Sequence, residues 1–127
     1  MREPDEIFAH AIQLFNKQLY FECHEELEEE LWQACTDPVL RNYYQGLIQV
    51  AVGLLHCQRG NIKGARRVLS KSYERLRQTM SHSLPSKQQI ELRTLVTEVD
   101  AILKRLDRLN RMHSGAVLSY YPKIQWR

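Results

Sequence analysis

The sequence has few glycines and prolines, which interrupt helices, and few cysteines, which can cross-link a chain. Its 127 residues include five glycines, four prolines and three cysteines, and no run of about 18 apolar residues. The lack of such a run excludes a membrane-spanning helix in this sequence. An odd number of cysteines, whose spacing fits no zinc motif, argues against a disulfide framework and indicates buried reduced thiols. Residues 1–5 are too polar for a signal peptide, so we predict a cytoplasmic protein with one domain, residues 1–127.

The strict alternation of apolar and polar residues that marks a β-strand is also missing, and helical periodicity dominates throughout. We therefore predict an all-α fold: a single antiparallel bundle of about five helices with a docked C-terminal tail. The first predicted helix starts near Pro4, the second covers about residues 20–35, and the third runs from 38 to about 59. The fourth begins after an Asn61 cap, and the fifth covers residues 86–110. The fifth helix is predicted to open with a capping box at residues 86–89. The tail comprises residues 111–127.

Charge is unevenly divided between the two halves of the chain. Residues 1–60 carry ten acidic and four basic side chains, whereas residues 61–127 carry five and fourteen. The fourth predicted helix holds a basic cluster, which is either a solvated face or a surface for nucleic acid or an acidic partner. Its members are Lys63, Arg66, Arg67, Lys71, Arg75 and Arg77.

The second predicted helix is crowded with titratable groups. At about 100° per residue, four of its six glutamates fall on a polar half that water would solvate. His24 and Glu28 instead fall within the apolar arc, with Glu25 at its edge. Their i, i+4 spacing brings His24 and Glu28 into contact on one helix face. We predict that this pair points into the core.

The third predicted helix is apolar nearly all round, which is typical of a central helix. Gln45, Gln49 and His56 form one narrow polar stripe on it. Because unpaired buried polar groups each cost about 1–3 kcal/mol, two such sets on adjacent helices should satisfy each other or a ligand. The predicted site therefore lies between the second and third helices.

Three interpretations of this site remain open. A closed hydrogen-bond network would be structural and would fix how the helices pack against each other. A pocket would bind a small molecule or support acid–base chemistry through a His–Glu pair with shifted pKa values. His24, Glu28 and His56 would also supply nitrogen and oxygen ligands to a divalent metal, although the second histidine of the zincin helix is missing.

Three blocks of the chain resemble the family catalogued as domain of unknown function 309. They are residues 21–32 (FECHEELEEELW), residues 44–56 (YQGLIQVAVGLLH) and residues 60–65 (GNIKGA), within a family-like core of about residues 8–80. Gln18 and Cys23 depart from the residues that are frequent in the family. The resemblance implies an all-helical bundle in a small cytoplasmic protein of bacterial type, and it implies no activity.

The sequence leaves open whether the protein is an enzyme. It predicts a helical-bundle domain of unassigned activity, with a buried polar site that binds a small molecule or a metal. The alternative is a non-catalytic structural or partner-binding module, because residues 60–65 also resemble the turn of a tetratricopeptide-like hairpin.

Overall fold

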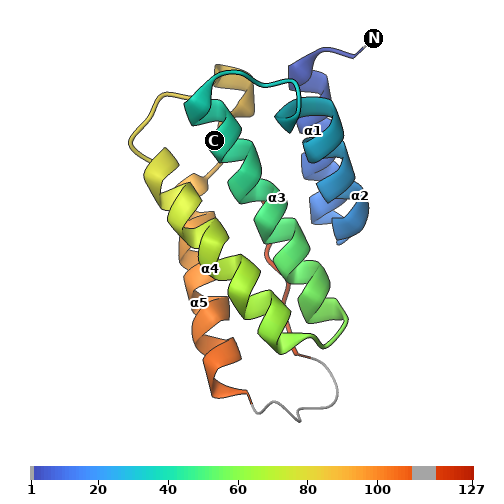
Figure 1. The fold of residues 1–127 in the computed structure, drawn as a ribbon, viewed down its shortest axis with the longest axis vertical. Helices are drawn as coiled ribbons and strands as arrows, with labels where there is room; N and C mark the ends of the chain where they lie inside the picture. The colour runs from blue at the N-terminus through green and yellow to red at the C-terminus, as the bar shows by residue number, and fades with distance from the viewer. Residues whose placement is uncertain (1, 110–116) are drawn as a thin grey trace.

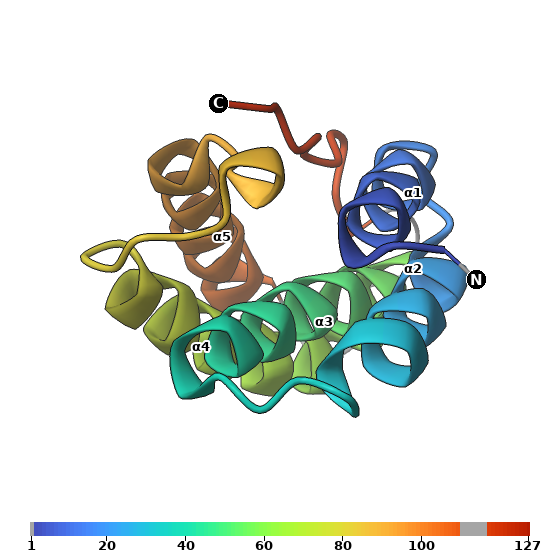
Figure 2. The same cartoon turned by 90° about the horizontal axis from the view of Figure 1, so that it is seen from above.

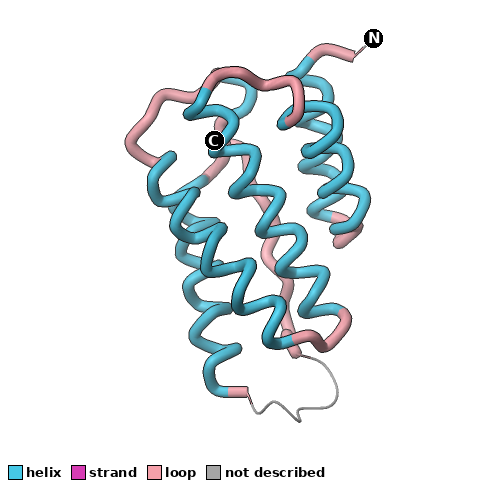
Figure 3. Tube along the Cα trace, viewed as in Figure 1, coloured by secondary structure: helices cyan, strands magenta, loops and turns pink. Residues whose placement is uncertain are grey.

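The computed structural model describes residues 2–109 and 117–127. This part of the chain is helical and contains no strand longer than an isolated bridge (Figures 1 and 3). The predicted all-α bundle is confirmed. Its elements are α1 (Pro4–Asn16), α2 (Tyr20–Glu25), the π-helical segment η1 (Glu26–Trp32), α3 (Pro38–Gln58), α4 (Ile62–Thr79), the short 3-10 segment η2 (Ser86–Gln88) and α5 (Leu92–Arg108).

Helix α3 is the central element of the bundle. It packs against α4 on one side and against α2 and η1 on the other, and α5 packs on α4. Viewed end-on, α1 and α2 lie on one side of α3 and α5 on the other, with the C-terminal segment running between α5 and α1 (Figure 2). Ten of the residues of α3 are buried, which agrees with its nearly continuous apolar sequence.

The predicted starts of α3 and α4 are confirmed by their caps. The carboxylate of Asp37 accepts hydrogen bonds from the amides of Val39 and Leu40, and Pro38 occupies the first helical turn. The side-chain oxygen of Asn61 accepts from the amide of Gly64 at 2.9 Å. Local hydrogen bonds of this kind satisfy the free amides of a helix start, so sequence alone locates them.

The predicted start of the fifth helix is wrong. Residues 86–88 form only a short 3-10 turn, and α5 begins at Leu92 with no side-chain cap. The reason is tertiary: the Gln88 side chain is buried in the bundle, and the Gln89 side-chain nitrogen donates to the Leu84 carbonyl. Ile90 then pairs with Trp126 in an isolated bridge. These contacts hold the segment extended.

The described part of the C-terminal tail docks on the bundle, as predicted. Val117, Leu118 and Ile124 are buried. The Asn16 side chain at the end of α1 donates to the Ile124 carbonyl at 3.0 Å and accepts from its amide at 2.7 Å. The other predicted tail residues, 111–116, lie outside the described residues. None of the described helices combines the length and apolar character that crossing a membrane requires.

Candidate functional site

His24 and Glu28 meet as their spacing predicts. His24 Nε2 lies 2.8 Å from Glu28 Oε2. Their side chains are 26% and 39% exposed, however, so the expectation of a pair buried in the core is wrong. Cys23, Leu27 and Leu31 fill the inner face of α2 and η1, which leaves the pair on the margin of the bundle.

The helix that carries this pair has an irregularity that periodicity did not predict. From Glu26 to Trp32 the helix is π-helical, and the Gln33 amide donates to the carbonyl of Glu28 at 3.0 Å. A π-helix bonds five residues back, so each turn is wider and the 100° increment no longer places side chains correctly. Such segments are rare and occur frequently at functional sites.

Side chains on the two flanks of this helical segment contact different residues. Glu26, on the side of α1, accepts from His10 at 3.0 Å and pairs with Arg2. Burial opposes the ionisation of Glu26, but the hydrogen bonds from these two groups outweigh it and hold its pKa below the usual range. On the side of α3, the guanidinium of Arg41 stacks 3.9 Å over the Trp32 ring.

The polar stripe of α3 is half-buried and incompletely paired. Gln45, Gln49 and His56 all have intermediate exposure. The side-chain oxygen of Gln49 is buried and has no hydrogen-bond partner among the described residues. Gln49 lies one turn from Gly46 and from Gly53, the two glycines that contact α4, so the stripe borders the α3–α4 contact.

His56 is tied to the turn that follows its helix. Its Nδ1 lies 3.2 Å from the side-chain nitrogen of Asn61, which can only donate, so Nδ1 accepts and the ring is neutral in this contact. Burial lowers the pKa of His56 below its usual value, and the nearby positive charges of Arg67 and Arg59 lower it further.

The two polar sets do not form one hydrogen-bonded cluster. Among residues 2–109 and 117–127, no hydrogen bond joins His24 or Glu28 to the stripe of α3, and no group of three His, Cys, Asp or Glu side chains is placed to hold a metal ion. The metal set expected from His24, Glu28 and His56 is therefore not assembled. His56 sits in the last turn of α3, and its ring nitrogen is bonded to Asn61.

Comparison with known proteins finds a family that the segment from α1 to the first part of α4 matches. Residues 8–68 match the family described as domain of unknown function (DUF309). The resemblance noted in the sequence is thus confirmed, over a segment that ends before the expected residue 80. The chain is also 36% identical over 69 residues to the uncharacterized protein YpuF of Bacillus subtilis (strain 168). The aligned region covers 54% of this chain and 39% of YpuF, so the chain accounts for well under half of that relative's length.

The basic cluster of α4 begins inside the DUF309 segment and extends beyond it. Half of its members have partners: Arg66 pairs with Asp107, Arg75 donates to Asn42 at 2.8 Å, and Arg77 lies over the Tyr73 ring. The remaining three are exposed and follow one another at i, i+4 spacing; they are Lys63, Arg67 and Lys71.

A buried polar network that joins the DUF309 segment to residues outside it was not predicted. Gln88 accepts a hydrogen bond from the Tyr44 hydroxyl at 2.5 Å and donates to Asp5 at 2.9 Å, while Tyr43 donates to its backbone carbonyl at 2.8 Å. These residues come from α1, α3 and η2, so no local pattern brings them together. The network fixes the connection between α4 and α5 on the bundle.

Proposed function

We propose that this protein is a non-catalytic binding module, and that it recognises an extended polar segment of a partner protein. The binding surface is a polar face composed of His24, Glu25 and Glu28 from α2 and η1 and of Gln45, Gln49 and His56 from α3. Residues 21–56, which carry all six, lie within the segment that matches DUF309.

The observation that carries the proposal is the unpaired oxygen of Gln49. A buried acceptor without a partner costs about 1–3 kcal/mol, so a sealed structural network would have paired it. Because this oxygen is buried, the Gln49 side chain would turn outward to accept a backbone N–H of a bound segment. Because a glutamine amide both donates and accepts, Gln45 and Gln49 suit the alternating groups of a peptide backbone.

The exposure of the face favours a macromolecular partner over a small molecule. All six side chains have intermediate exposure. None of them lines the cavities found around α5, at the start of α3 and at the end of α4. Small-molecule sites are concave and enclose most of their ligand, whereas protein interfaces spread over about 800 Å² per partner.

Selection from a phage-displayed random-peptide library on the immobilised protein tests this function. Enriched peptides are then measured by fluorescence anisotropy against the wild type and two variants, Gln49→Met and Glu28→Gln. Both changes keep the side-chain size and remove hydrogen-bonding or charge. Each should weaken binding by roughly tenfold, which corresponds to about 1.4 kcal/mol.

Gln13→Met is the matched control, because Gln13 is an exposed glutamine of a helix, α1, that contributes no residue to the face. Its affinity for the enriched peptides should equal that of the wild type. Failure to enrich any peptide, or equal binding by Gln49→Met and the control, would overturn the proposal.

A further inference from the structure

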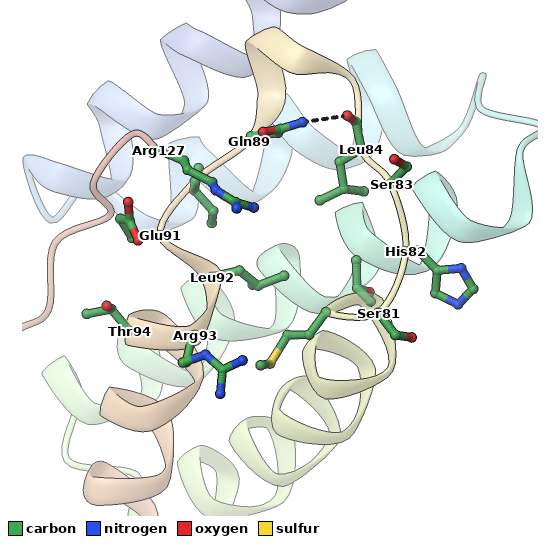
Figure 4. A pocket seen from close by; sticks show the side chains of 13 residues that line it. Ser81, His82, Ser83, Leu84, Gln89, Glu91, Leu92, Arg93, Thr94 and Arg127 are labelled. Carbon is green, nitrogen blue, oxygen red and sulfur yellow. Dashed lines mark hydrogen bonds between the residues drawn. The ribbon is translucent and has the colours of Figure 1, made fainter.

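A second feature involves none of the residues that the proposed function uses. A hollow of about 590 Å³ opens between the end of α4, the connection that follows it and the start of α5 (Figure 4). Its volume falls within the range of small-molecule sites, about 300–1,000 Å³. Residues from 79–94 and the final described residue, Arg127, line it.

Two arginines dominate the charge of this hollow. The Arg127 guanidinium points toward the middle of the hollow, the Arg93 guanidinium lies at its edge, and the His82 ring is turned away (Figure 4). Glu91 is the one acidic side chain of the lining. Among the described residues, neither arginine has a carboxylate within ion-pair distance, so both charges are available to a ligand.

Further hydrogen-bond donors line the same hollow. The Ser83 and Thr94 hydroxyl groups belong to the lining and make no side-chain hydrogen bond within the described chain. Helix α5 starts here without a side-chain cap, and the amides of Arg93 and Thr94 have no partner in the described part of the protein. The positive end of the helix dipole adds to the field of the two arginines.

The geometry points to an oxyanion site, and we propose that it binds the phosphate group of a small phosphomonoester. Guanidinium groups match phosphate oxygens in a bidentate manner, and hydroxyl and amide donors complete the shell around a tetrahedral anion. Met80, Leu84 and Leu92 also line the hollow and leave an apolar wall for the organic part of the ligand. This site uses no residue of the polar face, so the test of the site is independent of the test of the peptide-binding proposal.

Titration of the ¹⁵N-labelled protein with glycerol 3-phosphate, inorganic phosphate and glycerol, followed by NMR, tests the site. Glycerol 3-phosphate should give saturable shifts at the start of α5 with a Kd of about 1 mM or tighter, and glycerol should give none. The double variant Arg93→Gln/Arg127→Gln should weaken the binding by at least roughly tenfold. Inorganic phosphate that binds as tightly as glycerol 3-phosphate would identify free phosphate as the ligand; weaker binding would identify an organic phosphate.

The control is the double variant Lys63→Gln/Arg108→Gln, which removes the same net charge from exposed helical positions outside the hollow. It should retain wild-type affinity. The site is refuted if neither phosphate compound binds saturably below about 10 mM, or if the two double variants lose affinity equally. Thermal unfolding of each variant verifies that the fold is intact.

Discussion

Replacement of Gly53 by alanine should destabilise the protein by forcing α3 and α4 apart. A Cβ atom at this position would clash with Leu69, meeting its Cδ2 atom and lying only 2.5 Å from its Cγ. Leu69 is fully buried on α4. A clash with Cγ cannot be relieved by rotating the tip of the leucine, so the side chain or the helix must shift.

Two opposing terms determine the magnitude. Overpacking a dense core costs about 1–3 kcal/mol, and the involvement of Cγ favours the upper half of that range. Alanine is a better helix former than glycine by about 1 kcal/mol, which offsets part of the cost. The net loss of unfolding free energy should therefore be about 1–2 kcal/mol.

Urea denaturation monitored by circular dichroism measures this loss, with Thr97→Ala on the exposed side of α5 as the helix-propensity control. A double-mutant cycle with Leu69→Ala isolates the clash. Leu69→Ala alone should cost about 2–5 kcal/mol, and adding Gly53→Ala to it should cost nothing further, because the methyl group enters the space vacated. If Gly53→Ala is as stable as the wild type, or if the two changes are additive, the close approach of α3 and α4 at this point is refuted.

Three further predictions concern polar and thiol groups. Gln88→Ala leaves the Tyr44 hydroxyl buried without its acceptor and should cost about 2–3 kcal/mol in urea denaturation; a smaller loss than 0.5 kcal/mol, roughly the scatter of surface changes, would contradict the network. Burial lowers the pKa of His56 and the charge of Arg67 lowers it further, so the unfolded chain binds the proton more readily and stability falls as pH drops below about 6.5. Arg67→Gln should raise that pKa in an NMR titration and reduce the loss; an unchanged pKa would contradict the contact. Ellman's reagent should modify the half-buried Cys35 first, because burial raises the pKa of the other two thiols to about 12; equal rates for all three would argue against this.

Features that depend on neighbours within a few residues were predictable. Asp37 and Asn61 cap their helices because a cap bonds amides two or three positions away. His24 and Glu28 touch because one helical turn separates them. Gly46 and Gly53 of α3 face leucines of α4.

The candidate site was only partly predictable. The spacing of Gln45, Gln49 and His56 puts them on one stripe, but the sequence could not say how deep the stripe lies or which groups it meets. The prediction of a buried site assumed a regular helix through residues 20–35, and the π-helical turns of η1 violate that assumption. The start of α5 was misplaced for a related reason. The Gln88 side chain forms hydrogen bonds with Tyr44 and Asp5 instead of taking part in a helix cap.

The sequence by itself determined the helical class, the positions of most helices and the His24–Glu28 contact, because each results from local periodicity and from bonds within one or two turns. Only the tertiary structure decided the half-exposed depth of that pair, the unpaired oxygen of Gln49, and the presence of both Arg93 and Arg127 in the lining of one hollow. These depend on which elements lie side by side after folding, and the burial of apolar surface that drives the assembly is not directional. The local pattern therefore indicates which residues are candidates, and the packing of the bundle decides what each of them contacts.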